Sequence, residues 1–422
     1  MAQKFQTLPG FRDFYPADCT ARNYLFGQWR AVAKGYGFVE YDAPILEPTD
    51  LYKRKSGEEI SNQLFCFTDK GERDVSMRPE LTPSLARMAA ARQRDFKKPL
   101  KWFSIGQFFR YEKQQKGRLR EFYQFNCDIL GESSPAADAE LVALSIDLML
   151  ELGFTAQDFA IKLSDRTAWS IFIEQEGIEI EKTDAFLQVI DKLERDKAEK
   201  LDEKLAALGT SLTAVREFID SGVAEEKCES LQQILAELDA RGMRDFVRID
   251  LSIVRGLAYY SGPVFEVFDI GKGMRAIAGG GRYDQLVKLI GGVDLPAAGF
   301  AMGDVVVTDL IRETKTANQL LEEDVAGETL DAYVVIADEQ QRREGLQVVQ
   351  RLRENGLRVN FPLAAAKVNK QFQSAEQQKA DLAVIVGSDY PQISFKTLAK
   401  REECSCDISE LEDMADKLLL SL

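Results

Sequence analysis

Apolar and polar positions alternate along this chain with two different periods, and the order in which these periods follow one another predicts a mixed fold. Helical spacing of apolar residues in the first 153 residues predicts helices at 22–35, 83–94 and 138–152. Strand-like runs in the same part predict strands at 64–68, 73–78, 101–111 and 120–130. The last two runs flank the polar loop 113–117, which is typical of a long antiparallel hairpin. Thr82 stands where it would cap the second helix.

The pattern changes character twice after this hairpin. From about 165 to 245 the spacing is helical throughout, and we interpret this stretch as a helical insertion. Strand patterns return at 247–254, 263–268 and 275–278, before the run Gly279–Gly281 and a helix from Asp284. Residues 298–311 are then mostly apolar, with Gly299 near their start, and are predicted to continue into a helix.

The end of the chain has a simpler rhythm. A polar, acidic stretch at 314–329 is a linker candidate. Beyond it, strand and helix patterns alternate at 332–337, 340–355, 357–361, 369–379 and 382–386. This order predicts a small parallel or mixed sheet surrounded by helices.

Composition removes a large class of mechanisms, because none of the 422 residues is histidine. Ser-His-Asp hydrolysis, Cys-His proteolysis and HExxH zinc chemistry are therefore excluded. Any catalysis must come from carboxylates, arginine, lysine, tyrosine, hydroxyls, cysteine, backbone groups or a bound metal. The length suggests two or three domains, and 45% hydrophobic residues are enough for real cores.

The net charge of −15 argues against a general nucleic-acid binder, but its distribution is uneven. Residues 171–240 carry 18 acidic and 8 basic side chains, whereas residues 92–120 carry ten basic and two acidic ones. A phosphate-facing patch therefore fits the second stretch. Six scattered cysteines without a CxxC pair, no leader pattern and no apolar run of membrane length lead us to expect a reduced cytoplasmic protein without a membrane segment.

The predicted hairpin carries the densest group of chemically useful side chains. Strand alternation places Arg110 and Glu112 on one face of its first strand. The second strand would carry an aromatic residue, two amides and a carboxylate on one face: Phe122, Gln124, Asn126 and Asp128. Such a surface, next to a basic loop, suits a polyphosphate or the end of a nucleic acid. The alternative without a binding function is a strand face that is simply exposed to solvent.

Three other fragments add polar groups to apolar surroundings. Arg78, Glu80 and Thr82 alternate, so they share one face if the chain is extended there. The strand pattern near 252 ends in Arg255, Tyr259 and Tyr260. The run Gly279–Gly281 is either a tight strand-to-helix bend or backbone brought close to a ligand. Taken singly, each fragment also fits an ordinary structural role.

In this order the fragments resemble a class II aminoacyl-tRNA synthetase, and in particular the histidyl-tRNA synthetase family. Residues 37–44 resemble motif 1, which builds the dimer interface in that family, and residues 110–128 resemble motif 2. The segments 255–260 and 278–284 resemble two peptides peculiar to the histidine enzymes. The likeness covers nearly the whole chain and is weakest in the helical insertion.

The resemblance implies an α+β fold with a six- or seven-stranded antiparallel sheet. Residues 1–164 and 246–313 would form the class II catalytic domain, interrupted by the helical insertion at 165–245. The linker would be 314–329, and 330–422 would form a C-terminal α/β anticodon-binding domain.

The implied activity is that of a homodimeric, cytoplasmic histidine–tRNA ligase. Histidine would attack the α-phosphorus of ATP, with Mg²⁺ accompanying the nucleotide, and the resulting histidyl-adenylate would be transferred to tRNA(His). An ionised carboxylate needs no general base, so a chain without histidine can run this reaction through positioning and charge stabilisation. Arg110 and Arg255 would be the catalytic residues.

The resemblance also implies a role for each motif residue. ATP would be bound by Arg110, Glu112, Arg118, Phe122 and Arg255. Histidine would be bound by Glu80, Leu81, Thr82, Gln124, Asp128, Arg255, Tyr259, Tyr260 and Tyr283. The acceptor end of the tRNA would meet Gln115 and Arg120. No metal ligands are assigned.

Three positions depart from the family pattern. Ala258 stands where an acidic residue is usual, and Asp128 where many members have glutamate. Val306 occupies the place of the motif 3 arginine that clamps the γ-phosphate. Either Arg118 or Arg282 substitutes for that arginine, or ATP binding is weakened.

Two alternatives remain at this stage. A synthetase paralogue that binds histidine as a regulatory subunit, without charging tRNA, is favoured by Val306 and disfavoured by the retained Arg110, Glu112 and Arg255. Another class II synthetase, such as one for threonine, lacks the two histidine-type peptides. The absence of histidine residues has two explanations. One is compositional drift, and the other is that synthesis of this protein does not stall when histidine is scarce. Measuring the protein's synthesis rate during histidine limitation distinguishes them.

Overall fold

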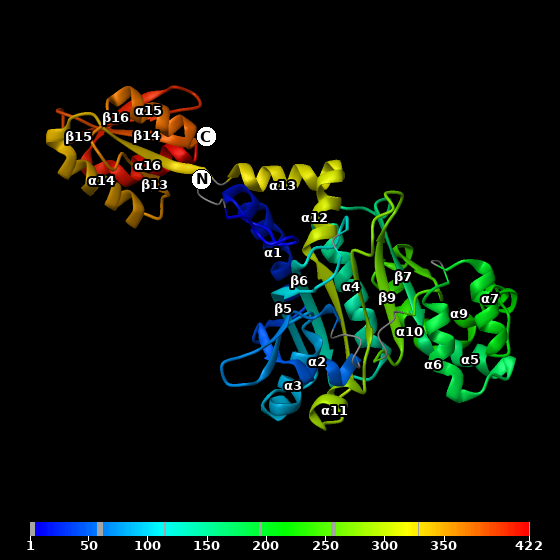
Figure 1. Ribbon diagram of the computed structural model, residues 1–422. Coiled ribbons are helices and arrows are strands. Elements are labelled where there is room, and N and C mark those ends of the chain that lie inside the picture. The colour runs from blue at the N-terminus through cyan, green and yellow to red at the C-terminus, as the bar shows by residue number, and fades with distance from the viewer. Residues whose placement is uncertain are drawn as a thin grey trace. The chain divides into compact units, whose positions relative to one another are not determined.

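The computed structural model describes residues 5–56, 62–113, 115–193, 196–254, 259–327 and 329–421. The predictions for Arg255 and Ala258 therefore lie outside the described residues. The chain divides into two compact units, Met1–Glu322 and Glu323–Leu422, which we describe separately (Figure 1). No helix within the described ranges is long and apolar enough to cross a membrane.

A central sheet, eight-stranded within the described residues, organises the first unit. In spatial order its strands are β1 (Val39–Glu40), β5 (Leu100–Phe109), β6 (Glu121–Leu130), β11 (Ala297–Gly303), β10 (Ala278–Arg282), β9 (Pro263–Asp269), β7 (Phe159–Asp165) and β8 (Val247–Ile249). Neighbouring strands from β5 to β7 are antiparallel, whereas β1 and β8 pair parallel at the two edges. The expected α+β fold with an antiparallel sheet is confirmed, and each edge carries one short parallel strand in addition.

The predicted hairpin is confirmed, and its second strand separates two environments. Strands β5 and β6 pair from Leu100 opposite Leu130 to Phe109 opposite Glu121. On one face of β6, Phe125 stacks on Trp29 of helix α1 (Pro16–Gly35), with ring centroids 5.7 Å apart. Residues at the alternate positions of β6 line cavities on the other face.

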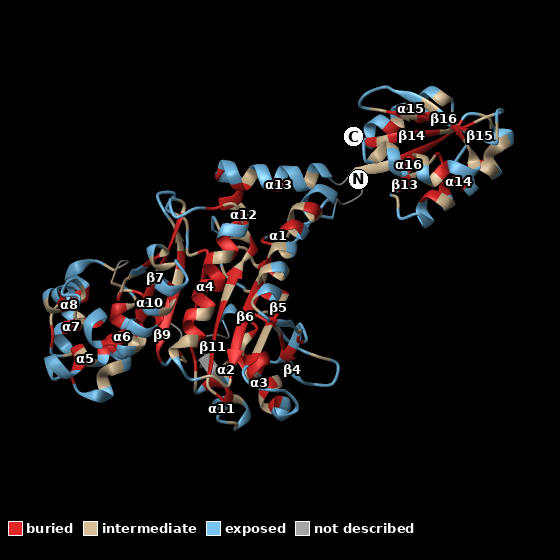
Figure 2. Cartoon of the chain, turned by 180° about the vertical axis from the view of Figure 1, so that it is seen from behind, coloured by how far each residue is buried: buried red, intermediate tan, exposed pale blue. Residues whose placement is uncertain are grey.

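Helix α4 (Pro135–Glu151) covers the first face of the sheet, where it packs against strands from β6 to β7. Figure 2 shows most of α4 buried, in keeping with the high share of apolar residues in its sequence. The other α-helices described up to residue 313, outside 166–240, are α2 (Thr49–Ser56), α3 (Thr82–Arg92), α11 (Leu286–Gly291) and α12 (Asp304–Glu313). A small separate sheet has the order β2 (Leu46–Pro48), β4 (Asp74–Met77) and β3 (Cys66–Thr68).

The stretch expected to be a helical insertion consists of helices wherever the structure describes regular elements between 166 and 240. They are α5 (Arg166–Glu176), α6 (Thr183–Ile190), α7 (Ala198–Ala207), α8 (Leu212–Asp220), α9 (Val223–Lys227) and α10 (Glu229–Ala240). Aromatic rings of Trp169, Phe172 and Phe218 lie within 6 Å of one another and form a small core of their own. The indole of Trp169 also donates a 3.1 Å hydrogen bond to the carbonyl of Leu251, in the segment that follows β8 (Val247–Ile249).

Three local predictions were wrong. Gly279–Gly281 is not a strand-to-helix bend: it lies inside β10, where only glycine fits at 280, since a Cβ there would sit 2.3 Å from the carbonyl oxygen of Gly299 on the neighbouring strand. The strand predicted at 247–254 is only Val247–Ile249. Thr82 is the first residue of α3 and makes no capping bond, since the cap position is Leu81.

The second unit contains the alternating pattern expected at the end of the chain. Strands β13 (Val359–Asn360), β12 (Leu330–Ile336) and β14 (Ala380–Val386) are parallel, and α14 (Arg342–Glu354) and α15 (Val368–Gln377) connect them. Two antiparallel strands, β15 (Gln392–Thr397) and β16 (Glu403–Asp407), extend the sheet, and α16 (Leu411–Leu419) follows. The stretch expected to be a polar linker is mostly helix α13 (Lys315–Gly327).

Candidate functional site

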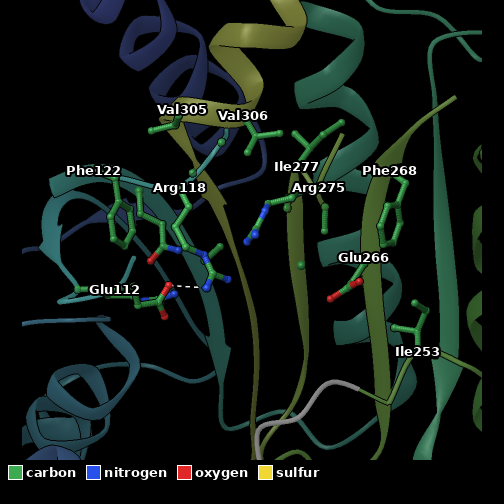
Figure 3. A pocket seen from close by; sticks show the side chains of 18 of the residues that line it. Glu112, Arg118, Phe122, Ile253, Glu266, Phe268, Arg275, Ile277, Val305 and Val306 are labelled. Carbon is green, nitrogen blue, oxygen red and sulfur yellow. Dashed lines mark ion pairs between the residues drawn. The ribbon is translucent and has the colours of Figure 1, made fainter. Parts of the chain in front are cut away.

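A large cavity of about 760 Å³ opens on the sheet face opposite α4 (Figure 3). Its walls come from the hairpin, from β9 and β10, and from the start of α12. The side chains that carry chemistry there are Arg110, Glu112, Arg118, Phe122, Gln124, Asp191, Glu266 and Arg275. A space of this size with aromatic and basic walls suits a nucleotide.

A second, smaller cavity of about 70 Å³ adjoins the large one. Its lining residues include Glu80, Thr82, Asn126, Asp128, Tyr259, Tyr260 and Tyr283. Four residues line both cavities: Arg110, Gln124, Gly279 and Ala301. The two spaces are therefore neighbouring compartments of one site, and Arg110 stands at their boundary.

Arg110 is held at this boundary by contacts along one edge of its guanidinium. Nε donates a 3.0 Å hydrogen bond to the carbonyl of Pro79. The guanidinium carbon lies 5.2 Å from the ring centroid of Phe122, a cation–π distance. Both contacts orient a delocalised positive charge toward the junction of the two compartments.

Glu112 and Arg118 form an ion pair on the hairpin side of the large cavity (Figure 3). Phe122 lies in the same wall, in the strand that follows the hairpin loop. An aromatic face beside a paired glutamate offers stacking together with a hydrogen-bond acceptor, which is what a purine with an exocyclic amine needs.

The far end of the small cavity is built around a buried carboxylate. The Tyr283 hydroxyl donates a hydrogen bond to Asp128. Burial raises the pKa of Asp128 to about 7, and the bond from Tyr283 opposes that rise. Burial, followed by the proximity of Asp128, raises the pKa of Tyr283 well above its ordinary value. The pair therefore presents an acceptor whose charge responds to pH near neutrality.

Comparison with known proteins decides the family. A histidyl-tRNA synthetase profile matches residues 10–304, and an anticodon-binding domain profile matches residues 331–418. The histidine–tRNA ligase of Opitutus terrae is 43% identical over 404 residues, which cover 91% of each chain. The chain belongs to the histidyl-tRNA synthetase family. The chloroplastic/mitochondrial histidine–tRNA ligase of Arabidopsis thaliana is a further relative, 36% identical over 96% of this chain and 85% of its own.

Solved structures share the fold of this histidyl-tRNA synthetase family member. The histidyl-tRNA synthetase of a Nostoc species superposes with a TM-score of 0.78 over the whole of both chains, at 23% identity. A Bacillus halodurans protein described as an ATP phosphoribosyltransferase regulatory subunit/histidyl-tRNA synthetase has a TM-score of 0.71 at 19% identity and covers 92% of this chain and 100% of its own. These likenesses show the fold alone, so the fold does not separate a synthetase from a regulatory subunit.

The structure brings most of the residues predicted from the family motifs into the two compartments. Glu112, Arg118 and Phe122 line the large one, and Glu80, Thr82, Asp128 and the three tyrosines line the small one. Leu81 is the exception: its side chain is buried against Ala43 and Phe108, away from both cavities.

The two residues predicted to meet tRNA lie in and beside the hairpin loop. Gln115 is exposed, and its side-chain oxygen accepts a hydrogen bond from Arg275. Arg120 is half-buried: Nε donates to the carbonyl of Glu112 at 3.2 Å, and its guanidinium lies 4.4 Å from the ring centroid of Tyr111. The protein itself therefore orients Arg120.

Arg282 does not enter either cavity, so it cannot substitute for the missing motif 3 arginine. It is buried, with side-chain bonds to the carboxylates of Asp138 and Asp284 and to the carbonyls of Glu132 and Ser134. Four acceptors on the helical side of the sheet hold it there.

Sequence reasoning missed three cavity residues: Asp191, Glu266 and Arg275. Asp191 and Glu266 had no motif around them, and only the fold of α6 and β9 brings them to the site. Arg275 was assigned to the first position of a strand predicted at 275–278, but β10 begins only at Ala278. A basic residue four positions before a glycine run would have been the available signal.

Proposed function

We propose that this chain activates histidine with ATP to form histidyl-adenylate and then transfers the histidyl group to tRNA(His). The observation that carries this proposal is the pair of adjoining compartments with Arg110 at their junction. A nucleotide in the large compartment and an amino acid in the small one would meet there, with a fixed cation beside the reacting groups. Membership of the histidyl-tRNA synthetase family supports the same reaction.

Adenylate formation follows from charge placement. The histidine carboxylate is already ionised and attacks the α-phosphorus, while pyrophosphate leaves as an anion and no proton has to be removed. Arg110, and Arg255 outside the described residues, would neutralise charge on the α-phosphate, each contributing about 2–4 kcal/mol by analogy with oxyanion-hole donors. The adenine would stack on Phe122 beside Glu112. Arg118 would face the outer phosphates.

Histidine recognition would use the small compartment. Glu80, Thr82 and Gln124 would surround the ammonium group, and Asp128 and Tyr260 would serve the two imidazole nitrogens. Tyr259 and Tyr283, whose rings are nearly perpendicular with centroids 6.0 Å apart, would form the walls. Amino acids without the ring nitrogens would leave these buried polar groups unpaired, which is a strong basis for selectivity.

Magnesium fits the large compartment as a companion of ATP. Proteins bind Mg²⁺ through one or two carboxylates together with substrate phosphates, and Glu266 and Asp191 provide carboxylates in this cavity. When bound, the ion would neutralise charge on the phosphates. The described residues contain no cluster of three or more His, Cys, Asp or Glu arranged as a metal site, so the phosphates would supply the remaining ligands.

The partners proposed for the chain are tRNA(His) and a second copy of itself. Gln115 and Arg120 would meet the acceptor end, and the domain at 331–418 would meet the anticodon. A homodimer is supported by apolar side chains exposed in the motif 1 region, where Val39 is 64%, Ile45 44% and Leu46 43% exposed. All six cysteines are unpaired, which supports action in the cytoplasm.

The second candidate is a regulatory paralogue that binds histidine without charging tRNA. Val306 favours it, and the fold is compatible with it. Two observations favour the synthetase. The chain has an anticodon-binding domain, and its similarity to a relative named histidine–tRNA ligase extends over 91% of its length.

ATP–pyrophosphate exchange against a panel of amino acids tests the proposal. We expect exchange with histidine alone, and histidine binding without exchange would instead support the regulatory paralogue. Arg110→Ala should lower exchange roughly 100- to 1,000-fold, and Arg255→Ala should abolish it without loss of the fold. Arg92→Ala, an exposed arginine paired with Asp95, is the matched control that should leave exchange unchanged.

A further inference from the structure

The large cavity contains an arginine to which neither the motifs nor the proposed function assigns a role. Arg275 lies in the loop between β9 and β10, and its side chain points into the cavity between Arg118 and Glu266 (Figure 3). Its guanidinium donates a hydrogen bond to the side-chain oxygen of Gln115 in the hairpin loop. The loop therefore holds the positive charge over the cavity.

The wall next to Arg275 lacks the charge that the family pattern places there. Val305 and Val306, at the start of α12, present only apolar groups to the cavity. A Cβ built on Gly117 would lie 3.2 Å from Cγ2 of Val306 and 3.8 Å from Cδ of Arg275. The two side chains thus flank the same point of the hairpin turn, and the arginine reaches it from the loop between β9 and β10.

The other arginines near this site make different contacts. Arg282 is buried among four acceptors on the helical side of the sheet. Arg110 is fixed at the junction of the compartments, and Arg118 is paired with Glu112. Arg275 lines the large cavity and lies, like Val306, against Gly117 of the hairpin turn.

We propose that Arg275 binds the outer phosphates of ATP and replaces the motif 3 arginine from a different segment of the chain, the loop between β9 and β10. This assignment rests on the proposed function. A guanidinium matches phosphate oxygens in pairs and keeps its charge at any working pH. Bound there, it would stabilise the pyrophosphate that carries away the negative charge when the α-phosphorus is attacked.

Binding of ATP and of AMP to the full-length protein separates this role from a general effect on the site. Arg275→Ala should weaken ATP binding about 30-fold or more, as expected for loss of a charge-assisted bidentate contact. It should leave AMP binding unchanged, because AMP has no outer phosphates. Arg312→Ala removes one positive charge from the exposed face of the same α12 and is the matched control. Arg275→Lys should retain part of the ATP affinity, because its ammonium cannot bind two oxygens in a fork.

A rescue experiment tests the replacement itself. Val306→Arg in the Arg275→Ala background should restore at least about tenfold in ATP affinity, because residue 306 lines the same cavity. The proposal is overturned if Arg275→Ala binds ATP like the parent protein, or if it loses ATP and AMP equally. Absence of histidine-dependent exchange in the parent protein would refute the proposed function instead, and the ATP-against-AMP comparison would still decide the role of Arg275.

Discussion

The Tyr283 hydroxyl donates a hydrogen bond to the carboxylate of Asp128, a residue 155 positions earlier in the chain, and both groups are buried. Tyr283 follows β10 and Asp128 lies on β6, with β11 between the two strands. The bond stabilises the ionised form of a carboxylate that burial would otherwise keep protonated. The proposed histidine pocket therefore depends on a contact across three strands.

The pH dependence of histidine binding should report this bond. The pKa of Asp128 is about 7, so its ionised fraction, and with it the affinity for an imidazole N–H, should rise between pH 6 and 8. Tyr283→Phe removes the bond that lowers this pKa, so the rise in affinity should move to higher pH by roughly one unit, equivalent to about 1.4 kcal/mol at fixed pH.

The measurement is the KM for histidine in pyrophosphate exchange from pH 6 to 9. Asp128→Asn should remove the carboxylate's contribution and leave only the titration of histidine itself, near pH 6.5. An unchanged profile in Tyr283→Phe would show that Asp128 does not receive the imidazole.

Gly299 should tolerate no side chain. A Cβ at this position of β11 would lie 1.9 Å from Oδ1 and 2.7 Å from Cγ of Asp128. Gly299→Ala should displace the carboxylate, break its bond with Tyr283 and raise the KM for histidine about 30-fold or more, the equivalent of roughly 2 kcal/mol.

Gly27→Ala is the matched control, because Gly27 lies on helix α1 with no atom within 4 Å of the added methyl group. It should leave KM unchanged and raise stability by up to about 1 kcal/mol. Equal effects of the two substitutions on histidine KM would contradict the steric account.

Arg166 should control turnover although it lies in the helical insertion. Its Nε donates to the carbonyl of Val254 at 3.3 Å, and another guanidinium nitrogen donates to the carbonyl of Tyr260 at 2.8 Å. Both carbonyls belong to residues that line the site. Arg166→Ala should therefore lower kcat roughly tenfold or more, since hydrogen bonds from charged groups contribute about 1.5–3 kcal/mol.

Thermal unfolding and steady-state exchange, measured together, separate this positioning role from a loss of folding. Arg166→Lys should recover only part of kcat, because an ammonium group lacks the two-pronged donor geometry with which the guanidinium reaches both carbonyls. Arg216→Ala, an exposed arginine on α8 of the insertion, should change neither quantity. A normal kcat in a folded Arg166→Ala protein would refute the coupling.

The buried ion pair between Arg282 and Asp138 should be essential for stability. Their side chains are only 6% and 3% exposed. Asp138→Ala would leave the buried Arg282 with the partly exposed Asp284 as its remaining carboxylate partner, and should lower the free energy of unfolding of the first unit by about 3 kcal/mol, measured by urea denaturation. Glu339→Ala breaks an exposed pair with Arg342 in the second unit and should cost at most about 1 kcal/mol. Comparable losses would contradict the structural role of Asp138.

Local sequence determined much of the scaffold. Alternation along residues 121–130 placed Phe122, Gln124 and Asp128 on one strand face before any partner strand was known, because side chains of a strand point to opposite faces with a period of two. Helical spacing likewise identified α4 and the helices of the insertion. The family motifs then indicated which of these residues belong to one site.

Tertiary structure decided what periodicity does not encode. Whether Arg275 or Arg282 faces the cavity depends on where β10 begins and on which acceptors surround each guanidinium, and those acceptors come from distant segments. Gly279–Gly281 lies inside a strand because β10 pairs with both β9 and β11, and the close approach of β11 leaves no room for a Cβ at Gly280. Local patterns specify the face and the type of an element. Register and long-range packing, which bring together Asp128 and Tyr283 or Arg275 and Val306, exist only once the whole sheet has formed.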